Sequence, residues 1–319
     1  MTSVPGASTL GKEGLRSRSF PPPYNRTSPL KDARPMELQR ATPCSDLGPW
    51  IHSFREYTFS PDDRERFTSL PGTGGELWLK TSGRLCLSGQ PEGDGLLCLR
   101  SRKLQFQQKQ LRVFSIRFRA GSLPFFTQRP LAELIDHYTP LERQWDDSAL
   151  QQLQALRRSP HFDEQCLLAE RFLLSRLSAR RQLEKVHRLA SLMYERSADF
   201  TLGEYAEELV CDRRHLSRQF RDTQGTTTKH FHRLCRFERF LRDALFAAKP
   251  SLSGLAADHG YYDQAHMQHD FRKFSQMSPG KLLAQEEARL FYSPRLTPGL
   301  SIAPTSGRLI RQNTSSPLR

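Results

Sequence analysis

The sequence predicts an α+β protein in which a small β-rich N-terminal domain with trailing helices precedes an all-α C-terminal domain of two helix-turn-helix units joined by a long helix. Two observations support this prediction. Before about residue 120, apolar and polar residues alternate in strand-length pieces, and after about residue 130 apolar residues recur every three or four positions. A length of 319 residues also favours two domains over a single core.

The changes in composition along the chain predict four parts. Residues 1–40 and 293–319 are rich in Ser, Pro and Arg with little periodic apolar content, so we expect a disordered basic N-terminal segment and a disordered tail. Between them we expect a β-rich sensor or dimerisation domain over residues 41–180 and a helical domain over residues 184–289.

Short alternating segments fill the predicted β-rich domain. Glu76–Thr81 and Arg84–Leu87 are expected to pair as a hairpin across Ser82-Gly83, a two-residue loop of suitable composition. The clearest strand is Arg112–Arg119, where three large apolar residues alternate with polar ones and predict one buried and one polar face. These apolar residues are Phe114, Ile116 and Phe118.

Helical spacing begins near Pro130. It predicts helices over 131–138, 147–157, 161–180 and 183–196. The third of these carries a single apolar stripe, with acids in its first turn and arginines near its end. The stripe comprises Phe162, Cys166, Ala169, Leu173 and Leu177. Two interpretations stay open: this helix packs within its own domain, or it forms a dimer interface.

Two similar helix pairs dominate the C-terminal domain. In the first, an apolar helix beginning at Leu202 ends at Val210-Cys211, and Asp212 can cap a second helix that buries Leu216 and Phe220. In the second, His259-Gly260 makes the turn and Asp263 can cap the next helix. Its buried residues are expected to be Met267, Phe271 and Phe274.

The second helix of each pair is polar on its outward face, as a recognition helix in a major groove about 12 Å wide must be. Arginine can bind guanine through two hydrogen bonds, glutamine suits adenine, and alanine can contact the thymine methyl group. The outward residues are Arg213, Arg214, Ser217, Arg218 and Arg221 in the first unit and Gln264, Ala265, Gln268 and His269 in the second. The phosphate candidates are Arg213, Arg221, Lys229, Gln268, Arg272 and Lys273.

A long basic helix, Thr227 to about Ala247, joins the two pairs. It carries five cationic side chains against two acids, Glu238 and Asp243, so we expect some of the basic ones to contact phosphates. The cationic residues are Lys229, Arg233, Arg236, Arg239 and Arg242.

Composition narrows the class of protein. A net charge of +14 and a pI near 9.9 favour a polyanionic partner such as DNA. No apolar run approaches the roughly 20 residues of a membrane span, and the first residues lack a secretory signal, so we expect a cytoplasmic protein with no membrane contact. The six cysteines are scattered without a C-x-x-C pair, which favours reduced thiols.

The region from about Glu184 to Gln285 resembles the DNA-binding domain of AraC/XylS-type bacterial transcription regulators. The similarity is strongest over LAADHGYYDQAHMQHDFRKFSQMSPGKLL, where Gly260-Tyr261, Asp263-Gln264 and Ser278-Pro279 fall on the family pattern. The resemblance implies two recognition helices, Asp212–Asp222 and Asp263–Phe274, which enter successive major grooves on one face of the DNA. Carried over by position, it implies that the base-edge candidates are Arg214, Ser217, Arg218, Gln264, Ala265 and His269.

The sequence departs from the family pattern at two places. His269 stands where arginine is usual, and a shorter side chain that is only partly charged near neutrality weakens the expected contact there. The first turn uses Val210-Cys211 in place of a glycine turn. His215 and His266 match family positions that support local packing, so we expect no metal and no cofactor.

The N-terminal half is similar, over shorter stretches, to a sensor-type domain of such regulators, which implies effector binding or dimerisation. Residues Trp78, Phe114, Arg117 and Phe118 could line an effector pocket, although their alternation is typical of ordinary core and surface positions. The effector-binding residues are therefore left unassigned.

The leading hypothesis is a sequence-specific, non-enzymatic transcription regulator. Its expected partners are double-stranded promoter or operator DNA, with RNA polymerase, an unknown small effector and a second copy of the chain as further candidates. Two alternatives stay open. One is a DNA-binding domain fused to an enzyme, such as a cysteine alkyl-acceptor repair protein, which needs a reactive cysteine or a zinc cluster. The other is a nonspecific DNA-associated protein.

Overall fold

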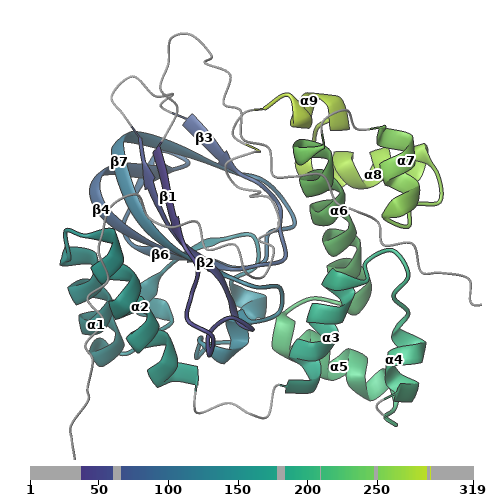
Figure 1. Ribbon diagram of the computed structural model, residues 1–319, viewed down its shortest axis with the longest axis horizontal. Coiled ribbons are helices and arrows are strands. Elements are labelled where there is room, and N and C mark those ends of the chain that lie inside the picture. The colour runs from purple at the N-terminus through teal and green to yellow at the C-terminus, as the bar shows by residue number, and fades with distance from the viewer. Residues whose placement is uncertain are drawn as a thin grey trace, which may run out of the picture. The chain divides into compact units, whose positions relative to one another are not determined.

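A computed structural model describes residues 37–59, 66–177, 184–208, 210–247, 251–285 and 288, and over these residues the fold is α+β, as predicted (Figure 1). One antiparallel sheet occupies the N-terminal half and helices follow it. The strands are β1 Glu37–Ala41, β2 Ile51–Thr58, β3 Arg66–Ser69, β4 Glu76–Leu87, β5 Gln90–Glu92, β6 Gly95–Leu97, β7 Leu104–Phe118 and β8 Tyr138–Pro140.

The sheet is centred on its two longest strands, β4 and β7. The strand order is β1-β2-β7-β4-β6-β8. Outside this order, β3 pairs with β7 and β5 pairs with β4. Neighbouring strands run antiparallel throughout the described sheet. The β7 strand is 15 residues long and pairs with β4 along most of its length, whereas β3 and β2 pair with its first and last parts.

The predicted hairpin across Ser82-Gly83 is wrong. Both of its segments belong to β4, and both pair with β7. The register shifts between Lys80 and Arg84, where Gly83 has φ of +78° and a Cβ atom there would lie 2.1 Å from the Gln110 carbonyl oxygen. Glycine therefore produces an irregularity within one strand, and the loop-like composition of this segment reflects that irregularity.

Both faces of the sheet are buried near its centre, including the face that the alternation predicts to be polar. On one face Phe54 and Phe114 stack, and Phe114 packs on Phe162 of the helix α2 (Phe162–Leu177), with ring centroids 5.9 Å apart. On the other face the polar residues Ser115 and Arg117 are 0% and 5% exposed. The alternation correctly predicts one apolar and one polar face, but the polar face is covered by other parts of the protein.

The helix predicted over 131–138 is also wrong. Only Leu131–Glu133 forms a short 3₁₀ turn, η2, and the chain then enters β8 at Tyr138. Asp136 lies between them with φ of +63°, and its carboxylate accepts hydrogen bonds from the backbone N–H and the hydroxyl of Ser101. Helical spacing over eight residues was too short a signal to exclude this turn-and-strand arrangement.

The two helices after the sheet match their predictions. Helix α1 spans Asp147–Arg158 and α2 spans Phe162–Leu177, and they pack on each other and on β4 and β7 (Figure 1). Asp146 caps α1 by accepting a hydrogen bond from Ala149 N at 2.8 Å. Of the predicted α2 stripe, Ala169 and Leu173 are fully buried and the other members are half-buried.

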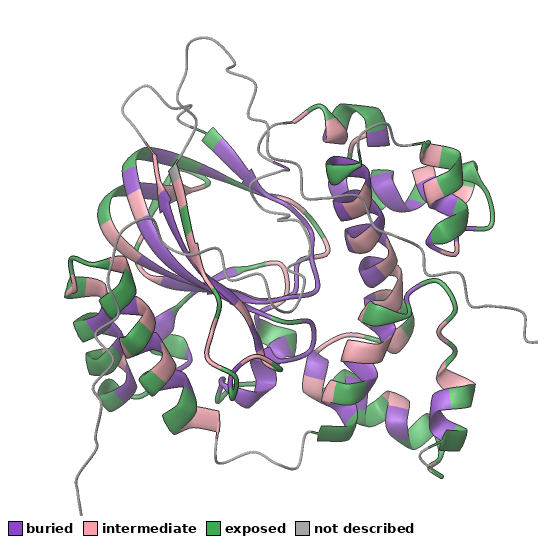
Figure 2. Ribbon diagram, in the orientation of Figure 1, coloured by how far each residue is buried: buried purple, intermediate pink, exposed green. Residues whose placement is uncertain are grey.

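Seven helices form the described C-terminal region: α3 Glu184–Glu195, α4 Leu202–Glu208, α5 Arg213–Gln224, α6 Thr228–Phe246, α7 Leu252–Asp258, α8 Gln264–Ser275 and α9 Pro279–Leu283. Helix α6 is the longest of these and contacts α3, α5, α7, α8 and α9. Its apolar residues, except the exposed Phe246 at its end, are buried and form the centre of the helical core (Figure 2).

Contacts join the sheet and these helices into one compact unit over residues 34–319. Strand β1 begins at Glu37, so the last residues of the predicted disordered segment 1–40 form a strand. The rest of that segment and the predicted tail 293–319 lie outside the described residues. The described helices include none that is both long and apolar enough to cross a membrane.

Candidate nucleic-acid interface

The first helix-turn-helix unit consists of α4 and α5. Asp212 caps α5 as predicted, because its carboxylate accepts a hydrogen bond from His215 N at 2.7 Å. Leu216 and Phe220 point into the core and are almost fully buried. Gly225 ends the helix in the left-handed conformation, with φ of +70°. The remaining face of α5 is therefore presented outward.

The second unit consists of α7 and α8 and repeats this construction. Asp263 caps α8 by accepting a hydrogen bond from His266 N, also at 2.7 Å. Met267, Phe271 and Phe274 are fully buried, as predicted. The next cap is also local, since Ser278 accepts a hydrogen bond from Lys281 N and Pro279 occupies the first turn of α9.

The structure places the outward candidates of both units at the surface. Ser217 and Gln268 are half-buried, and the other candidates are exposed: Arg213, Arg214, Arg218, Arg221, Lys229, Gln264, Ala265, His269, Arg272 and Lys273. On α5, Arg214 and Arg218 are one helical turn apart and are both exposed, so they can face the same groove.

The sequence predicts that some arginines of α6 contact phosphates, but three of them bind groups within the protein. Arg233 binds the buried carboxylate of Asp270 on α8, with Nε 3.1 Å from Oδ1. Arg236 donates to the Gly260 carbonyl at 3.1 Å, and Arg239 donates to the carbonyls of Tyr194 and Glu195. These cations therefore fasten α6 to its neighbours, and their hydrogen bonds are directed inward.

The two histidines with family-pattern positions have local roles. His266 packs edge-on against Tyr261, with ring centroids 5.3 Å apart. His215 is exposed in the first turn of α5, where its backbone N–H binds the Asp212 cap.

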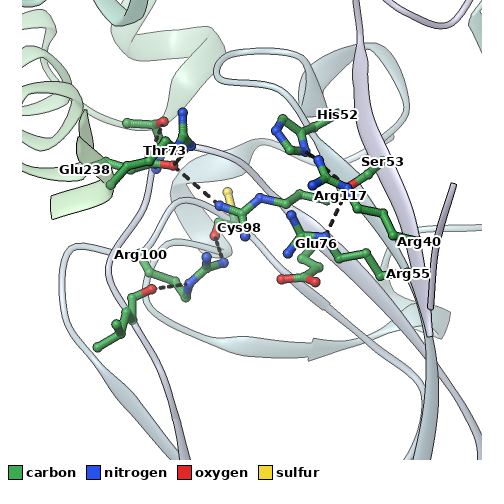
Figure 3. Close-up of polar contacts among 12 residues, drawn as sticks. Arg40, His52, Ser53, Arg55, Thr73, Glu76, Cys98, Arg100, Arg117 and Glu238 are labelled. Atoms are coloured by element: carbon green, nitrogen blue, oxygen red, sulfur yellow. Dashed lines mark hydrogen bonds and ion pairs between the residues drawn. The ribbon is translucent and has the colours of Figure 1, made fainter. Parts of the chain in front are cut away.

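A buried ionic cluster lies where α6 meets the sheet, centred on Glu238 (Figure 3). Its Oε2 accepts hydrogen bonds from Thr73 N at 2.8 Å and Thr73 Oγ1 at 2.7 Å. Its Oε1 lies 3.4 Å from Arg117 of β7 and 3.3 Å from Arg242, one turn further along α6. Both carboxylate oxygens are thus engaged, one by the sheet loop and one by two arginines.

Electrostatics in this cluster favour a charged carboxylate. Burial by itself would raise the pKa of Glu238, but Arg242 and Arg117, with the hydrogen bonds from Thr73, hold that pKa below its ordinary value. The pKa of Glu76 is likewise lowered against the effect of burial, by Arg117, Arg55 and Arg100. Burial and the surrounding arginines hold the pKa of His52 well below its ordinary value.

Sequence reasoning missed the role of Glu238, although a signal was present. It is one of two acids on a strongly basic helix, it sits among apolar positions next to Phe237, and Arg242 follows four residues later. An acid in that setting is buried only when it is paired.

A second contact joins the first unit to the sheet region. Gln224, at the end of α5, donates to the Gly121 carbonyl at 3.0 Å. A Cβ atom on Gly225 would lie 2.4 Å from Ala132 N, so the cap of α5 packs directly on η2. These contacts involve the C-terminal end of α5, whereas Arg214 and Ser217 lie in its N-terminal turns.

Three of the six cysteines do not have the setting of a reactive thiol. Cys98 and Cys235 are buried, and burial raises the pKa of Cys98 to about 12 and the pKa of Cys235 well above its ordinary value. Burial also raises the pKa of Cys166. A nucleophilic cysteine needs a lowered pKa and access to substrate, so these three thiols give no support to the alkyl-acceptor alternative.

The residues considered for an effector pocket separate into two groups. Trp78 and Phe114 are core residues, at 2% and 0% exposed. Arg117 and Phe118 line a cavity between the sheet and the helices. The cavity wall also includes His52, Thr73, Arg119, Tyr194, Glu195, Glu238 and Arg242.

The chain is similar to known proteins in one family and among solved structures. Residues 205–285 match the family described as a helix-turn-helix domain. Among solved structures, the chain is similar to ToxT from Vibrio cholerae, with 11% identity and a TM-score of 0.43 over 72% of this chain and 97% of ToxT. It is also similar to the C-terminal domain of AraT, a response regulator from Geobacillus stearothermophilus, with 22% identity and a TM-score of 0.30 over 39% of this chain and 97% of that domain.

No curated protein matches the sequence significantly. The family match begins in α4 and ends just after α9, so it covers both helix pairs and the helix that joins them. Residues 205–285 of the chain are thus a helix-turn-helix domain.

Proposed function

We propose that the protein is a sequence-specific transcription regulator that reads two successive major grooves with α5 and α8. The observation that carries this proposal is that the polar residues of α5 and α8 and the arginines of α6 point in different directions. The base-edge candidates of both helices face solvent, whereas the arginines at positions 233, 236 and 239 of α6 bind internal groups.

The two recognition helices contribute unequally to DNA binding. Helix α5 presents Arg214 and Arg218, whose guanidinium groups can each bind a guanine edge through two hydrogen bonds. Helix α8 presents Gln264, Ala265 and His269, and none of these is an arginine that could bind a guanine edge in the same way. We therefore assign the larger share of specific affinity to α5. Phosphate contacts come from Arg213, Arg221, Lys229, Gln268, Arg272 and Lys273.

The test is selection of binding sites from random duplex DNA, followed by affinity measurements near physiological salt. We expect a site with two conserved segments about one helical turn, or 10–10.5 bp, apart. Equal affinity for selected and scrambled duplexes would contradict the proposal and favour a nonspecific DNA-associated protein.

Dimerisation through α2 is the second part of the proposal. Leu167 and Leu174 are large apolar residues left 58% and 38% exposed. With Glu164 and Arg171, which are also exposed, they follow a three-four-three spacing and lie on one face of the helix.

The charges on this face favour an antiparallel pair of α2 helices. A parallel pair would place like charges of Glu164, and of Arg171, next to each other. An antiparallel pair would place Glu164 beside Arg171 of the partner subunit, twice, with Leu167 between the two ion pairs. A second copy of this chain therefore fits the surface better in the antiparallel orientation.

Regulation by a small effector is the third part. The cavity between the sheet and α6 is the natural location, because any ligand there touches both the sheet and the helix that joins the two DNA-reading units. RNA polymerase is the expected protein partner of a regulator bound at a promoter.

A further inference from the structure

The turn of the second helix-turn-helix unit packs directly on the chain that leads into the first unit. Gly260, between α7 and α8, has φ of +70°, and a Cβ atom there would lie 2.5 Å from the carbonyl oxygen of Ala198 and 2.8 Å from its Cα atom. Ala198 belongs to the loop that connects α3 to α4. A side chain at position 260 would not fit, so glycine allows the two backbones to touch.

Two side chains of α6, one helical turn apart, bind the two sides of this contact. His232 Nε2 donates to the Ser197 carbonyl oxygen at 2.9 Å, next to Ala198. Arg236 Nη1 donates to the Gly260 carbonyl oxygen at 3.1 Å. These five residues, Ser197, Ala198, His232, Arg236 and Gly260, are called the junction below. It ties the first unit, the second unit and α6 together at one point.

Arg236 makes a second contact with the same turn. Its guanidinium carbon lies over the ring of the buried Tyr261, 5.4 Å from the ring centroid. A cation on an aromatic face is attracted to it, so the guanidinium group is held between the ring and the Gly260 carbonyl. Lysine could keep the charge and one donor at this position, whereas an apolar residue would lose both contacts.

The junction restricts movement between the units more than apolar packing does. Helix α5 packs on α6 through Phe220 and Phe231, with ring centroids 5.2 Å apart, and α8 packs on it through Phe237 and Phe271, 4.8 Å apart. Apolar burial is non-directional, so packed helices can slide slightly against each other. Hydrogen bonds to backbone carbonyls are directional and weaken steeply when the donor moves out of line. The junction therefore opposes this sliding.

The separation of α5 and α8 decides which DNA sites the protein can bind with both helices. One base pair inserted between the two segments moves the second segment by about 3.4 Å along the duplex axis and turns it by roughly 35°. Units that were free to adjust could follow this displacement. Units that are held together cannot, so one of the two helices loses its contacts with base edges.

We propose that the junction holds α5 and α8 at one separation, so that the protein accepts DNA sites of a single spacing and rejects sites one base pair longer or shorter. His232 and Arg236 are positioning residues, because they act on DNA through the loop and the turn that they bind. This inference rests on the proposed function, since it concerns the spacing of the two segments that α5 and α8 read.

The test compares the affinity of the full-length protein for three duplexes by fluorescence anisotropy. One carries the selected site, and the other two have one base pair inserted or removed between its two segments. The wild-type protein should lose about tenfold or more in affinity on either change, because the base contacts of one helix are lost. Arg236→Leu should reduce this loss to about threefold or less, since α8 can then follow the displaced segment.

Three further variants separate positioning from general stability. His232→Leu removes the hydrogen bond on the other side of the junction and should relax the spacing preference in the same way. Arg236→Lys keeps the charge and a donor, so it should retain most of the preference. The matched control is Arg188→Leu, which removes an exposed ion pair with Glu208 between α3 and α4 and should leave the preference unchanged. Circular dichroism checks that each variant is folded.

A wild-type protein that binds all three duplexes equally well overturns the proposal, regardless of how the variants fold. So does a spacing preference that persists in both Arg236→Leu and His232→Leu, or one that Arg188→Leu relaxes to the same extent. In each of these cases, tighter binding to selected than to scrambled duplexes leaves the proposed function standing. Equal affinity for selected and scrambled duplexes would overturn the proposed function and this inference with it.

Discussion

Val210 and Gly260 occupy the same position in the two helix-turn-helix units. Both have left-handed backbone conformations, with φ of +49° and +70°. In both turns the following residue donates to the carbonyl five positions earlier, from Cys211 to Ala206 at 3.0 Å and from Tyr261 to Ala256 at 2.9 Å. The first turn therefore has a β-branched valine, 93% exposed, in a left-handed conformation that disfavours it. The second turn has glycine, the residue best suited to that conformation.

Replacing Val210 with glycine should stabilise the protein. The left-handed conformation costs a β-branched residue on the order of 1–3 kcal/mol, and the greater entropy of glycine in the unfolded chain offsets part of the gain from removing that cost. We expect a net gain of about 1 kcal/mol in the free energy of unfolding by urea.

The reciprocal change, Gly260→Val, is the control for this prediction. A Cβ atom at Gly260 would lie 2.5 Å from the Ala198 carbonyl oxygen, so this variant should lose more stability than Val210→Gly gains. A loss of stability in Val210→Gly would mean that the valine side chain makes a stabilising contact.

Arg218→Ala should weaken specific DNA binding by about 1–3 kcal/mol and relax base preference at one position. Its exposed guanidinium group lies one turn from Arg214 on the outward face of α5. His269→Ala on α8 should cost less, because histidine is only partly charged at neutral pH. Fluorescence anisotropy with the selected site and single-base variants gives both values. The opposite ranking would make α8 the principal reader.

Lys229 and Arg233 should behave differently although both are basic residues of α6. Lys229 is exposed, so Lys229→Ala should lower the slope of log affinity against log salt by about one and leave stability unchanged. Arg233→Ala should destabilise folding by about 3–5 kcal/mol, because it leaves the Asp270 carboxylate buried without its cation. An unchanged salt slope in Lys229→Ala would remove Lys229 from the phosphate contacts.

Glu238→Gln should destabilise the protein by about 3–5 kcal/mol, since Arg117 and Arg242 would lose their shared buried carboxylate. The control is Glu208→Gln, which removes an exposed ion pair with Arg188 and should cost at most about 1 kcal/mol. Urea unfolding measures both. Similar small losses in the two variants would show that the Glu238 pairs contribute little to holding α6.

Exchanging charges on α2 tests the antiparallel dimer. Glu164→Arg and Arg171→Glu should each weaken self-association, because each converts two ion pairs into two repulsive contacts. The double variant restores opposite charges and should recover dimerisation. Sedimentation velocity at several concentrations measures the monomer–dimer equilibrium. A double variant as weak as the single ones would contradict this pairing, as would a wild-type protein that remains monomeric.

The sequence alone determined the local elements of the C-terminal domain. Asp212 and Asp263 were predicted to cap α5 and α8, and both do so through hydrogen bonds to the backbone three residues later. The apolar residues of these helices were likewise identified, since helical periodicity and capping depend on neighbours within one or two turns. The outward positions of Arg214 and Arg218 follow from the same periodicity.

Only the tertiary structure decided the remaining features, because they depend on residues far apart in the chain. The segments on either side of Gly83 form one strand since both pair with β7, and local composition cannot reveal that partner. Glu238 is buried because Thr73 and Arg117, more than 100 residues earlier, supply its donors and its counter-charge. Arg233 likewise pairs with a residue distant in the chain, the buried Asp270, and does not point toward solvent. Periodicity tells which side of a helix is polar, but whether that side meets water, DNA or another buried charge is decided by the packing of the whole chain.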